Sequence, residues 1–254
     1  MSMEKLITGE KIVKSYGNGS EKNIVLNGVS VTIDKGEFVA VMGPSGSGKT
    51  TLLYALSWMD GIDEGEVCFC DAPLSGLRED ELADLRRKEM GFVFQQPTLL
   101  KNLNLLDNIV LPALRDNPKS GKVLAKKAQS LMSKMGIGEL SERGVTQVSG
   151  GQLQRAGICR ALINDPKIIF GDEPTGALNS KSAQEIMDLL TSINNSGTAI
   201  LLVTHDARVA ARAQRVLFMR DGNIVSTVNL SSFTSDNFEE KVECVSEKMR
   251  DIEI

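Results

Sequence analysis

Residues 43–50 of the 254-residue chain read GPSGSGKT and match the phosphate-binding pattern G-x-x-x-x-G-K-(S/T). An apolar run, 38–42, precedes them and predicts a buried strand, and 51–56 predicts a helix that begins directly after the loop. Glycines let backbone N–H groups wrap around an anion, and a helix start adds unpaired donors and the positive end of a dipole. In this context the pattern favours phosphate binding over a glycine-rich turn without a ligand. The chain is therefore predicted to bind a nucleoside triphosphate.

The loop also supplies a cation and a hydroxyl. Lys49 is expected to reach the terminal phosphates, and the Thr50 hydroxyl is expected to ligate magnesium. The predicted phosphate-binding residues are Gly43, Pro44, Ser45, Gly46, Ser47, Gly48, Lys49, Thr50 and Thr51.

Composition excludes several classes of protein. The hydrophobic content of 41% and the charged content of 24% are those of a soluble globular protein, and a net charge of −4 gives no electrostatic reason to expect nucleic acid as the partner. No apolar run approaches the ~18 residues of a membrane span, and no apolar signal begins the chain. We expect a protein kept in a reducing cytosol, whose membrane role would come through a partner. Cys68 and Cys70 alternate on one predicted strand, and buried small residues are favoured over a metal pair.

Periodicity predicts an α/β core interrupted by a helical insert between about residues 97 and 160. A polar, acidic and loosely packed tail, with at most one helix, is expected from about 229. The expected strands are 6–13, 24–33, 66–70, 91–94, 168–170 and 199–203, a hairpin of 215–219 and 223–226 turning at 221–222, and a turn at 17–20. The expected helices are 79–88, a helical stretch within 104–161 with apolar residues at 124, 128, 131 and 135, and 183–193, which Gly197 ends.

Two adjacent carboxylates, Asp172 and Glu173, follow the apolar strand 168–170. Ligands of open α/β sheets bind at the carboxyl ends of the strands, so Asp172 is predicted to hold magnesium and Glu173 to activate the attacking water. The only histidine of the chain, His205, follows the strand 199–203 and would emerge at the same edge. A lone histidine is more often incidental, but this location favours a hydrogen bond to the γ-phosphate or to the attacking water.

A second glycine-containing helix start comprises Ser149, Gly150, Gly151 and Gln152. Taken alone, it is best explained as a capped helix start, but it also forms an anion-binding nest. One fold is unlikely to bring two such nests onto a single phosphate chain. The second nest therefore indicates a head-to-tail dimer, with two ATP molecules between the subunits.

Five separated motifs occur in order: 43–50, Gln95, 148–152, 172–175 and His205. Over residues 4–228 the chain resembles the nucleotide-binding subunit of ATP-binding cassette (ABC) transporters. The resemblance implies a P-loop NTPase fold with a RecA-like core, an N-terminal antiparallel β subdomain and a helical insert specific to the family. It further implies an ATP-binding domain at 1–228 (core 1–96 and 161–228, helical subdomain about 97–160), a tail at 229–254, and ATP and Mg²⁺ as cofactors.

The resemblance also assigns roles to individual residues. Tyr16 matches the aromatic residue that stacks on adenine, the alternative being an ordinary strand-end tyrosine. Gln95 matches the glutamine that contacts magnesium and water and transmits nucleotide occupancy, so the implied catalytic set is Glu173, His205 and Gln95, and the implied metal set is Thr50, Gln95 and Asp172. Asn179 stands where the family usually has a dimer-contact aspartate, which puts the strength of subunit coupling in doubt.

Within the family, the motifs are similar to the branch of macrolide exporters and lipoprotein-releasing complexes, and most like bacitracin-resistance-type transporters of peptide antibiotics. That likeness implies a membrane permease as partner, a place at the cytoplasmic face of a bacterial cell membrane, and a sensor kinase as a further candidate partner. A lipoprotein- or macrolide-handling transporter, a soluble ABC ATPase acting in DNA repair or on ribosomes, and a non-hydrolysing nucleotide-binding scaffold are the alternatives. The single motif set, the lack of a heptad run, and intact Glu173 and His205 disfavour the last two.

Overall fold

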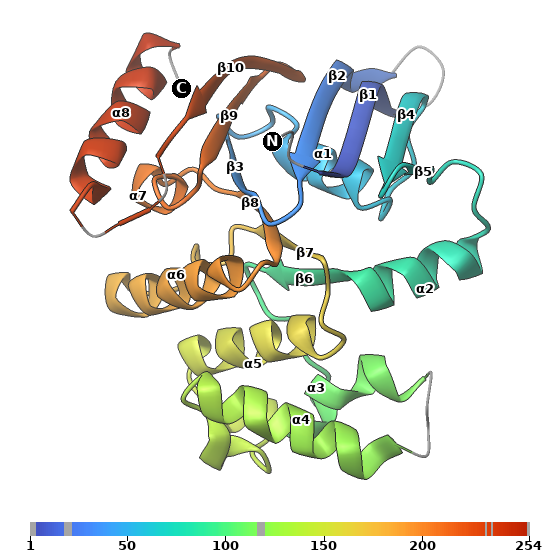
Figure 1. Ribbon diagram of the computed structural model, residues 1–254, viewed down its shortest axis with the longest axis vertical. Coiled ribbons are helices and arrows are strands. Elements are labelled where there is room, and N and C mark those ends of the chain that lie inside the picture. The colour runs from blue at the N-terminus through green and yellow to red at the C-terminus, as the bar shows by residue number, and fades with distance from the viewer. Residues whose placement is uncertain (1–3, 18–21, 116–119, 232, 235, 253–254) are drawn as a thin grey trace. The chain divides into compact units, whose positions relative to one another are not determined.

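The computed structural model describes residues 4–17, 22–115, 120–231, 233–234 and 236–252 (Figure 1). The chain forms two compact units, residues 1–82 with 199–254, and residues 83–198. The first unit contains β1 (Lys5–Tyr16), β2 (Asn23–Asp34), β3 (Phe38–Met42), α1 (Lys49–Leu56), β4 (Glu64–Phe69), β5 (Ala72–Pro73), β8 (Ala199–Val203), α7 (Ala207–Ala210), β9 (Arg215–Arg220), β10 (Asn223–Asn229) and α8 (Phe238–Asp251). The second contains β6 (Met90–Phe94), α3 (Leu105–Leu114), α4 (Gly121–Lys134), α5 (Gly150–Leu162), β7 (Ile168–Asp172), α6 (Ser180–Asn195) and the short 3₁₀ turns η3 (Gly138–Leu140) and η4 (Val145–Gln147), while α2 (Glu79–Glu89) spans the boundary.

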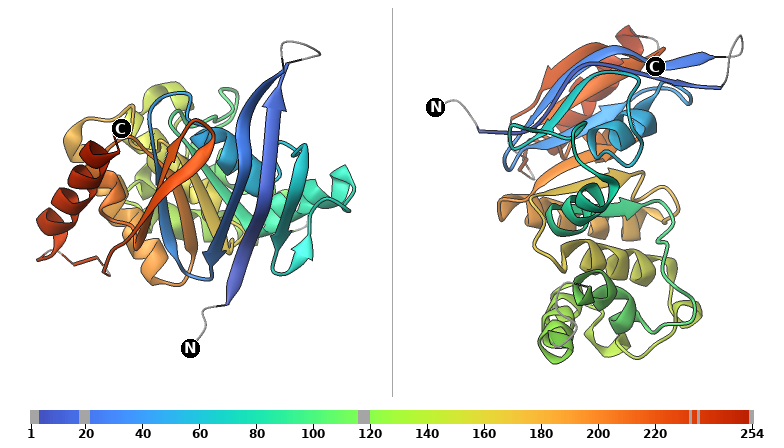
Figure 2. Two further views of the ribbon diagram at one scale, coloured as in Figure 1. Left: turned by 90° about the horizontal axis from the view of Figure 1, so that it is seen from above. Right: turned by 90° about the vertical axis from the view of Figure 1, so that its right-hand side faces the viewer.

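The first unit is built on two sheets. An antiparallel sheet with the strand order β2-β1-β4-β5 confirms the predicted N-terminal β subdomain, which Figure 2 shows in blue and cyan. In the other sheet, β3 pairs in parallel with β8 on one side and β9 on the other. Every residue of β3 and of β8 is buried. Because a strand that is covered on both faces must be apolar throughout, both strands are continuous apolar runs in the sequence. The phosphate loop thus begins at the end of a rigid, fully buried strand.

The β9–β10 hairpin turns where the sequence predicts. Asp221 has φ 49° and Gly222 has φ 74°, so both turn residues occupy the left-handed region that a two-residue hairpin turn requires. Of the turn expected at 17–20, only Gly17 is described, and 18–20 lie outside the described residues.

The second unit pairs β6 with β7 in parallel, with Phe94 opposite Asp172. Helices α3, α4 and α5 pack against one another, as Figures 1 and 2 show. Of the predicted apolar face, Ala128 in α4 and Met135 at its C-cap are buried, Leu124 and Leu131 are half-buried, and Met132 is buried beside them. Gly197 follows α6 with φ 106°, the conformation expected of a glycine that ends a helix. The predicted domain limits at residues 97 and 160 stay a prediction.

The expectation for the cysteine pair is wrong in part. Cys68 lies in β4, but Cys70 is in the two-residue turn to β5, where Cys70 and Asp71 have φ 48° and 62°. Both thiols are half-buried rather than buried. The predicted strand was extended through Cys70 because the turn at Cys70 and Asp71 contains no glycine, so the sequence gives no clear signal that the strand ends.

The C-terminal tail is more ordered than expected. Residues 238–251 form α8, which contacts α7 and buries Val245 completely. Cations and rings fasten it: the Arg212 guanidinium lies 4.2 Å from the centroid of Phe233, and that of Arg208 lies 4.8 Å from the centroid of Phe238. The polar composition did not predict this packing. Arginine side chains can cover apolar surface with their aliphatic carbons and aromatic rings with their guanidinium groups, so charged residues take part in it.

Lys241 on α8 is 4% exposed, and its ammonium donates to the carbonyl oxygens of Ala213 and Ser231, each at 3.0 Å. Burial, together with the charge of Arg212, lowers the pKa of Lys241 from 10.5 to about 8. Burying the ammonium therefore opposes folding below about pH 8. This opposition fades as the pH rises toward 10.5, because the unfolded chain then binds more protons than the folded one.

We predict that the free energy of unfolding of the wild type, measured relative to that of a Lys241→Met variant, increases between about pH 7.5 and about pH 10, by on the order of 1–3 kcal/mol. Urea unfolding of both proteins at the two pH values measures the difference. The variant serves as the reference for every other group that titrates in this range. Equal pH dependence of the two proteins would contradict the prediction.

Candidate functional site

The phosphate loop has the geometry of an anion cradle. Gly43, Gly46 and Gly48 all have positive φ, at 156°, 80° and 99°. A Cβ at Gly43 would lie 2.2 Å from the carbonyl oxygen of Met219, and one at Gly48 would lie 2.8 Å from that of Val25. Glycine is therefore required at both positions by close backbone approach as well as by conformation. Apart from its chain neighbours, no described residue has an atom within 4 Å of the position that a Cβ on Gly46 would take, so the tip of the loop is open.

Lys49 begins α1 and is 9% exposed. Its ammonium donates to the carbonyl oxygens of Gly43 at 2.9 Å and Pro44 at 2.8 Å, which holds the positive charge against the loop. Thr50 and Thr51, the next residues of the helix, are half-buried, while Pro44 and Ser45 are exposed at the tip. A cation, a helix start and a glycine loop thus converge, as a triphosphate requires.

One buried polar atom of the loop has no partner. Ser47 is 3% exposed, and its hydroxyl oxygen makes no hydrogen bond to any residue that the structure describes. Leaving a buried hydroxyl unpaired costs about 1–3 kcal/mol, so a native protein rarely keeps one without a use. An anion in the loop would accept this hydrogen bond. The donor set of the loop therefore fits a phosphate group.

His205 lies near the phosphate loop within the first unit. It follows β8, and β8 pairs in parallel with β3, with Val41 opposite Val203. Parallel strands end at the same edge of a sheet, so the loop after β3 and the histidine after β8 both leave at that edge. His205 is exposed, and the backbone N–H of Thr204 before it donates to Val41 at 3.0 Å.

The second unit brings the predicted acidic and amide groups together. Asp172 ends β7 opposite Phe94, so Gln95 leaves the sheet beside it. A Cβ at Gly176 would lie 2.9 Å from the Gln95 amide nitrogen and 3.2 Å from a Glu173 carboxylate oxygen. Gly176 therefore leaves the space in which these two side chains approach each other. Among the described residues, no three His, Cys, Asp or Glu side chains gather as a metal site. Magnesium ligation by Thr50, Gln95 and Asp172, which include only one such residue, stays a prediction.

Glu173 has φ 47°, an uncommon conformation for a residue with a side chain. The backbone N–H of Gly176 donates to the Glu173 carbonyl at 3.0 Å and stabilises this turn. Left-handed non-glycine residues cost roughly 1–3 kcal/mol and cluster at functional sites. The strained backbone supports a specific task for this carboxylate.

The second nest is a capped helix start. Ser149 is the N-cap of α5: its side chain accepts from the Gln152 N–H at 3.3 Å, and the Gln152 side chain accepts from the Ser149 N–H at 2.8 Å. Gly150 is exposed and Gly151 half-exposed, so the backbone around this start is accessible. The capping interpretation is correct, and it is compatible with anion binding at the same helix end.

Asn179 replaces the usual aspartate without loss of its local role. It is the N-cap of α6, and its side-chain oxygen accepts from the Ser182 N–H at 2.9 Å. Asparagine and aspartate are about equally good N-caps. The substitution therefore changes charge but not the helix start.

The sequence reasoning missed two residues that tie α5 to its surroundings. Gln154 is 1% exposed, and its amide donates to the Phe94 carbonyl at 3.0 Å, next to Gln95. Arg155 donates to the Met135 carbonyl at 2.6 Å and to Glu185 at 2.7 Å. The only available signal was the position of Gln154 among apolar residues of one helix.

Tyr16 ends β1 and is 43% exposed, which its predicted stacking role requires. Its hydroxyl donates to Asp60 at 2.7 Å, and the Lys14 ammonium lies 5.1 Å from its ring centroid. Burial, then the hydrogen bond to Asp60, raise the pKa of the phenol, so Tyr16 stays protonated as a donor.

The fold and the phosphate loop define an α/β protein of the P-loop NTPase class. The family model described as ABC transporter matches residues 26–176. The chain is 40% identical over 235 residues to the bacitracin export ATP-binding protein BceA of Halalkalibacterium halodurans, covering 92% of each chain. It is 41% identical over 226 residues to the macrolide export ATP-binding/permease protein MacB of Pasteurella multocida, covering 89% of this chain and 35% of that one. It thus spans about a third of the length of such relatives.

A solved dimeric structure, a post-hydrolysis state of the ATP-binding cassette MJ0796 bound to ADP and Pi, superposes with a TM-score of 0.80 at 36% identity, covering 90% of this chain and 100% of that one. The chain belongs to the ABC transporter family. The predicted fold, the activity as an ATPase, and ATP with Mg²⁺ as cofactors are confirmed by this membership.

We predict that Ser47→Ala stabilises the nucleotide-free protein by about 1 kcal/mol, because it removes an unpaired buried hydroxyl, and weakens ATP binding about tenfold, because it removes a hydrogen bond to a charged group. Urea unfolding and calorimetric titration with ATP measure the two effects. Ser45→Ala, at the exposed tip of the same loop, is the control for stability and should leave it unchanged. A loss of stability in Ser47→Ala would show that the hydroxyl has a structural partner.

Proposed function

We propose that this chain is the ATP-hydrolysing subunit of a membrane exporter, in which two copies close head-to-tail on two ATP molecules and drive a permease. The observation that carries the proposal is the second glycine-containing helix start, at the N-terminus of α5, where the backbone at Gly150 and Gly151 is accessible. The phosphate loop and His205 leave one sheet edge in the first unit, whereas Asp172, Gln95 and the α5 start belong to the second.

In this proposal, the residues of the second unit prepare the attacking water. Glu173 accepts its proton, and the Gln95 amide, which lies close to the same point beside Gly176, orients it. His205 donates a hydrogen bond to the γ-phosphate. Thr50, Gln95 and Asp172 would hold Mg²⁺, which would neutralise negative charge on the phosphates. Gln154 joins the α5 start to the backbone beside Gln95, so a change at either point is expected to reach the other.

Dimerisation is proposed because the phosphate loop already binds the nucleotide of its own chain. The second nest, at the start of α5, is then available for the nucleotide of another copy. The α5 start offers backbone donors and a helix dipole to the nucleotide held by the partner copy. The related cassette whose solved structure is dimeric covers 90% of this chain, which supports the same assembly.

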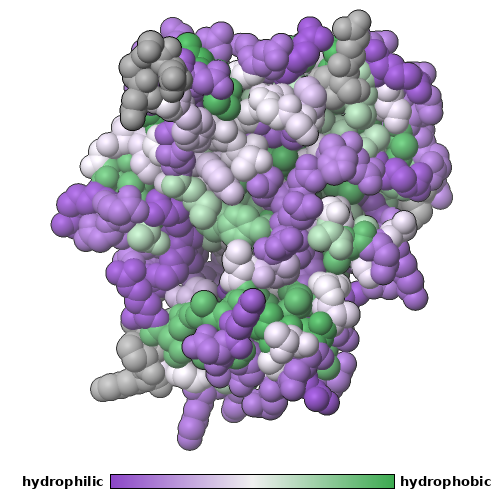
Figure 3. Space-filling view, turned by 180° about the vertical axis from the view of Figure 1, so that it is seen from behind, coloured by the Kyte–Doolittle hydropathy of each residue, from purple (hydrophilic) through white to green (hydrophobic). Residues whose placement is uncertain are grey.

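An integral membrane permease is proposed as the partner of this chain. The MacB relative carries ATP-binding and permease functions in one chain, and this chain matches 35% of it. Among the described residues, no helix has the length and apolar character needed to cross a bilayer. Figure 3 shows apolar side chains gathered on the lower part of one face, which the helices of the second unit form, and Leu100, Leu111 and Val123 of this unit are exposed. Such a surface supports a protein partner.

We further propose a place at the cytoplasmic face of a bacterial cell membrane and a role in peptide antibiotic export, with a sensor kinase as an additional partner. The relative named for bacitracin export, which this chain matches over 92% of both lengths, supports this class of substrate. Co-expression with the membrane partner should raise resistance to bacitracin. Resistance to macrolides alone would instead assign the chain to the function of the MacB relative.

Glu173→Gln is predicted to retain ATP binding, to accumulate as a dimer with ATP, and to lose about 10²–10⁴-fold in turnover, because the amide cannot accept the proton of the water. Steady-state phosphate release and size-exclusion chromatography with ATP and Mg²⁺ measure the two effects. Turnover at the wild-type rate would show that another group is the base.

A tandem dimer of two linked copies tests the head-to-tail arrangement. In the head-to-tail arrangement, each ATP site combines Lys49 of one half with Ser149 of the other half. Lys49→Ala in one half with Ser149→Ala in the other should therefore damage one site twice and leave the second site intact. Both changes in the same half should damage both sites. The first protein is therefore predicted to bind about one ATP more than the second. Asn104→Ala, which removes the N-cap of α3, controls for loss of a helix cap. The opposite ranking would mean that each copy completes its own site.

A further inference from the structure

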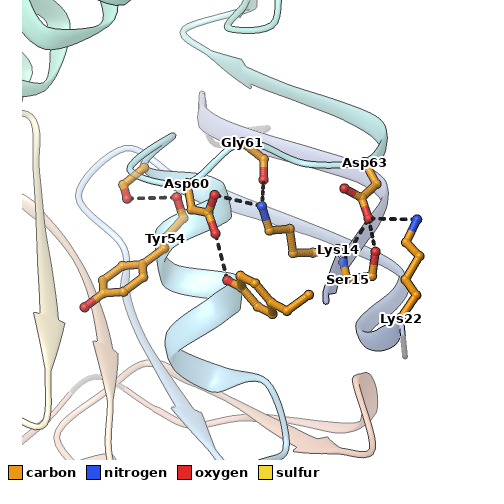
Figure 4. A network of polar contacts seen from close by, with 9 residues as sticks. Lys14, Ser15, Lys22, Tyr54, Asp60, Gly61 and Asp63 are labelled. Carbon is orange, nitrogen blue, oxygen red and sulfur yellow. Dashed lines mark hydrogen bonds and ion pairs between the residues drawn. The ribbon is translucent and has the colours of Figure 1, made fainter. Parts of the chain in front are cut away.

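Beside Tyr16, the loop that follows α1 makes a network of polar contacts with the end of β1 (Figure 4). Asp60 accepts from the Tyr16 hydroxyl with one carboxylate oxygen and from the Lys14 ammonium with the other, each at 2.7 Å. Lys14 also donates to the Gly61 carbonyl at 2.6 Å, and its side chain is 12% exposed. The carboxylate therefore bridges the ring of Tyr16 and the cation that lies over it.

A second carboxylate fastens the same strand without touching the ring. Asp63 accepts from both the backbone N–H and the hydroxyl of Ser15, and it lies 3.6 Å from the Lys22 ammonium. Its own N–H donates to the Val13 carbonyl at 2.8 Å. The loop of residues 57–63 thus holds the strand through Asp63 and the side chain of Tyr16 through Asp60.

The loop is tied in turn to the helix that begins at the phosphate loop. The carbonyl oxygen of Tyr54, in the last turn of α1, accepts from the Ser57 hydroxyl and from the N–H groups of Met59 and Asp60, at 3.2, 2.9 and 3.3 Å. Trp58 between them has φ 52°, the left-handed conformation that usually selects glycine after a helix. One helix therefore connects the loop that cradles phosphate to the carboxylate that holds Tyr16.

The charges of the network suit this task. Burial raises the pKa of Asp60, but the hydrogen bonds from Lys14 and Tyr16 outweigh it and hold the pKa below its usual range, so the carboxylate is ionised and accepts from both. Exposed ion pairs contribute little to stability. A tyrosine that is 43% exposed but held at its hydroxyl and over its ring has instead lost rotational freedom before any ligand arrives.

We propose that Asp60 and Lys14 are positioning residues for nucleotide binding, which hold the Tyr16 ring so that one face, opposite the Lys14 ammonium, receives the adenine base of ATP. The proposal rests on the proposed function as an ATP-hydrolysing subunit and on the predicted role of Tyr16 as the residue that stacks on the base. Since the ring is held in advance, stacking costs less conformational entropy. An immobilised side chain of this size corresponds to about three- to tenfold in affinity.

The test compares ATP with inorganic tripolyphosphate, which carries the phosphates but no base, by titration calorimetry. Asp60→Leu and Tyr16→Phe should each weaken ATP binding about three- to tenfold and leave tripolyphosphate binding unchanged. Because both changes remove the hydrogen bond between the Tyr16 hydroxyl and Asp60, the double variant should lose less than the sum of the two single losses. Asp63→Asn is the matched carboxylate control, since it lies in the same loop but does not contact the ring, and it should bind ATP as the wild type does. In turnover assays, KM for ATP should rise while kcat stays constant.

Tyr16→Ala separates this proposal from the stacking on which it rests. If Tyr16→Ala weakens ATP binding while Asp60→Leu and Tyr16→Phe do not, stacking stands and positioning by Asp60 is overturned. If Asp60→Leu and Tyr16→Phe weaken ATP and tripolyphosphate alike, the network supports the fold only, and the proposal is overturned. If Tyr16→Ala leaves ATP binding unchanged, the stacking role fails, and the positioning role fails with it.

Discussion

The parallel pairing of β3 with β8 and β9 is the constraint on which the phosphate loop depends. With a neighbour on each side and every side chain buried, β3 delivers the chain to Gly43 at a defined point. The loop then turns within a space too small for a Cβ at Gly43 or Gly48, and Lys49 returns to bond the carbonyl of Gly43. The resulting cradle is rigid before any phosphate arrives. Preorganised donors of this kind act strongly on an anion because they need no rearrangement when it binds.

In the second unit, a strained backbone at Glu173 and the small residue Gly176 determine where the functional side chains lie, whereas in the first unit a rigid loop does so. Glu173 keeps a left-handed backbone although it carries a side chain, and Gly176 three residues later leaves the room in which Glu173 approaches Gln95. A Cβ at position 176 would lie 2.9 Å from the Gln95 amide nitrogen, so the flexible Gln95 side chain would have to move away. The buried Gln154 then ties the start of α5 to the strand that delivers Gln95. Both ends of this connection belong to motifs that the sequence marks as functional, and the amide of Gln154 links them by one hydrogen bond.

Much of this could be predicted because it depends on local pattern. The buried strands 38–42 and 199–203 are continuous apolar runs, and the phosphate loop is set by glycine spacing, so a short window of sequence suffices. The contacts that the sequence did not reveal join residues far apart in the chain. Tyr16 and Asp60 are separated by 44 positions, and either residue alone resembles an ordinary surface side chain. The order of α8 was missed for the same reason, since Arg208 in α7 and Arg212 just after it lie on the rings of Phe238 and Phe233, more than 20 positions further along the chain.

Asn179 separates two roles that one aspartate would combine. An aspartate at the start of α6 would cap the helix and also carry a negative charge at its N-terminus. Asparagine preserves the cap, as the hydrogen bond from the Ser182 N–H shows, so the folded chain has no local need of the charge. Any effect of the missing charge must then arise where another molecule approaches this helix end. The neutral side chain of Asn179 loses the attraction that an aspartate would have for a cation. It also avoids the repulsion that an aspartate would have for a nucleotide or a carboxylate. The effect on subunit coupling therefore depends on the charge of the group on the other subunit that approaches Asn179.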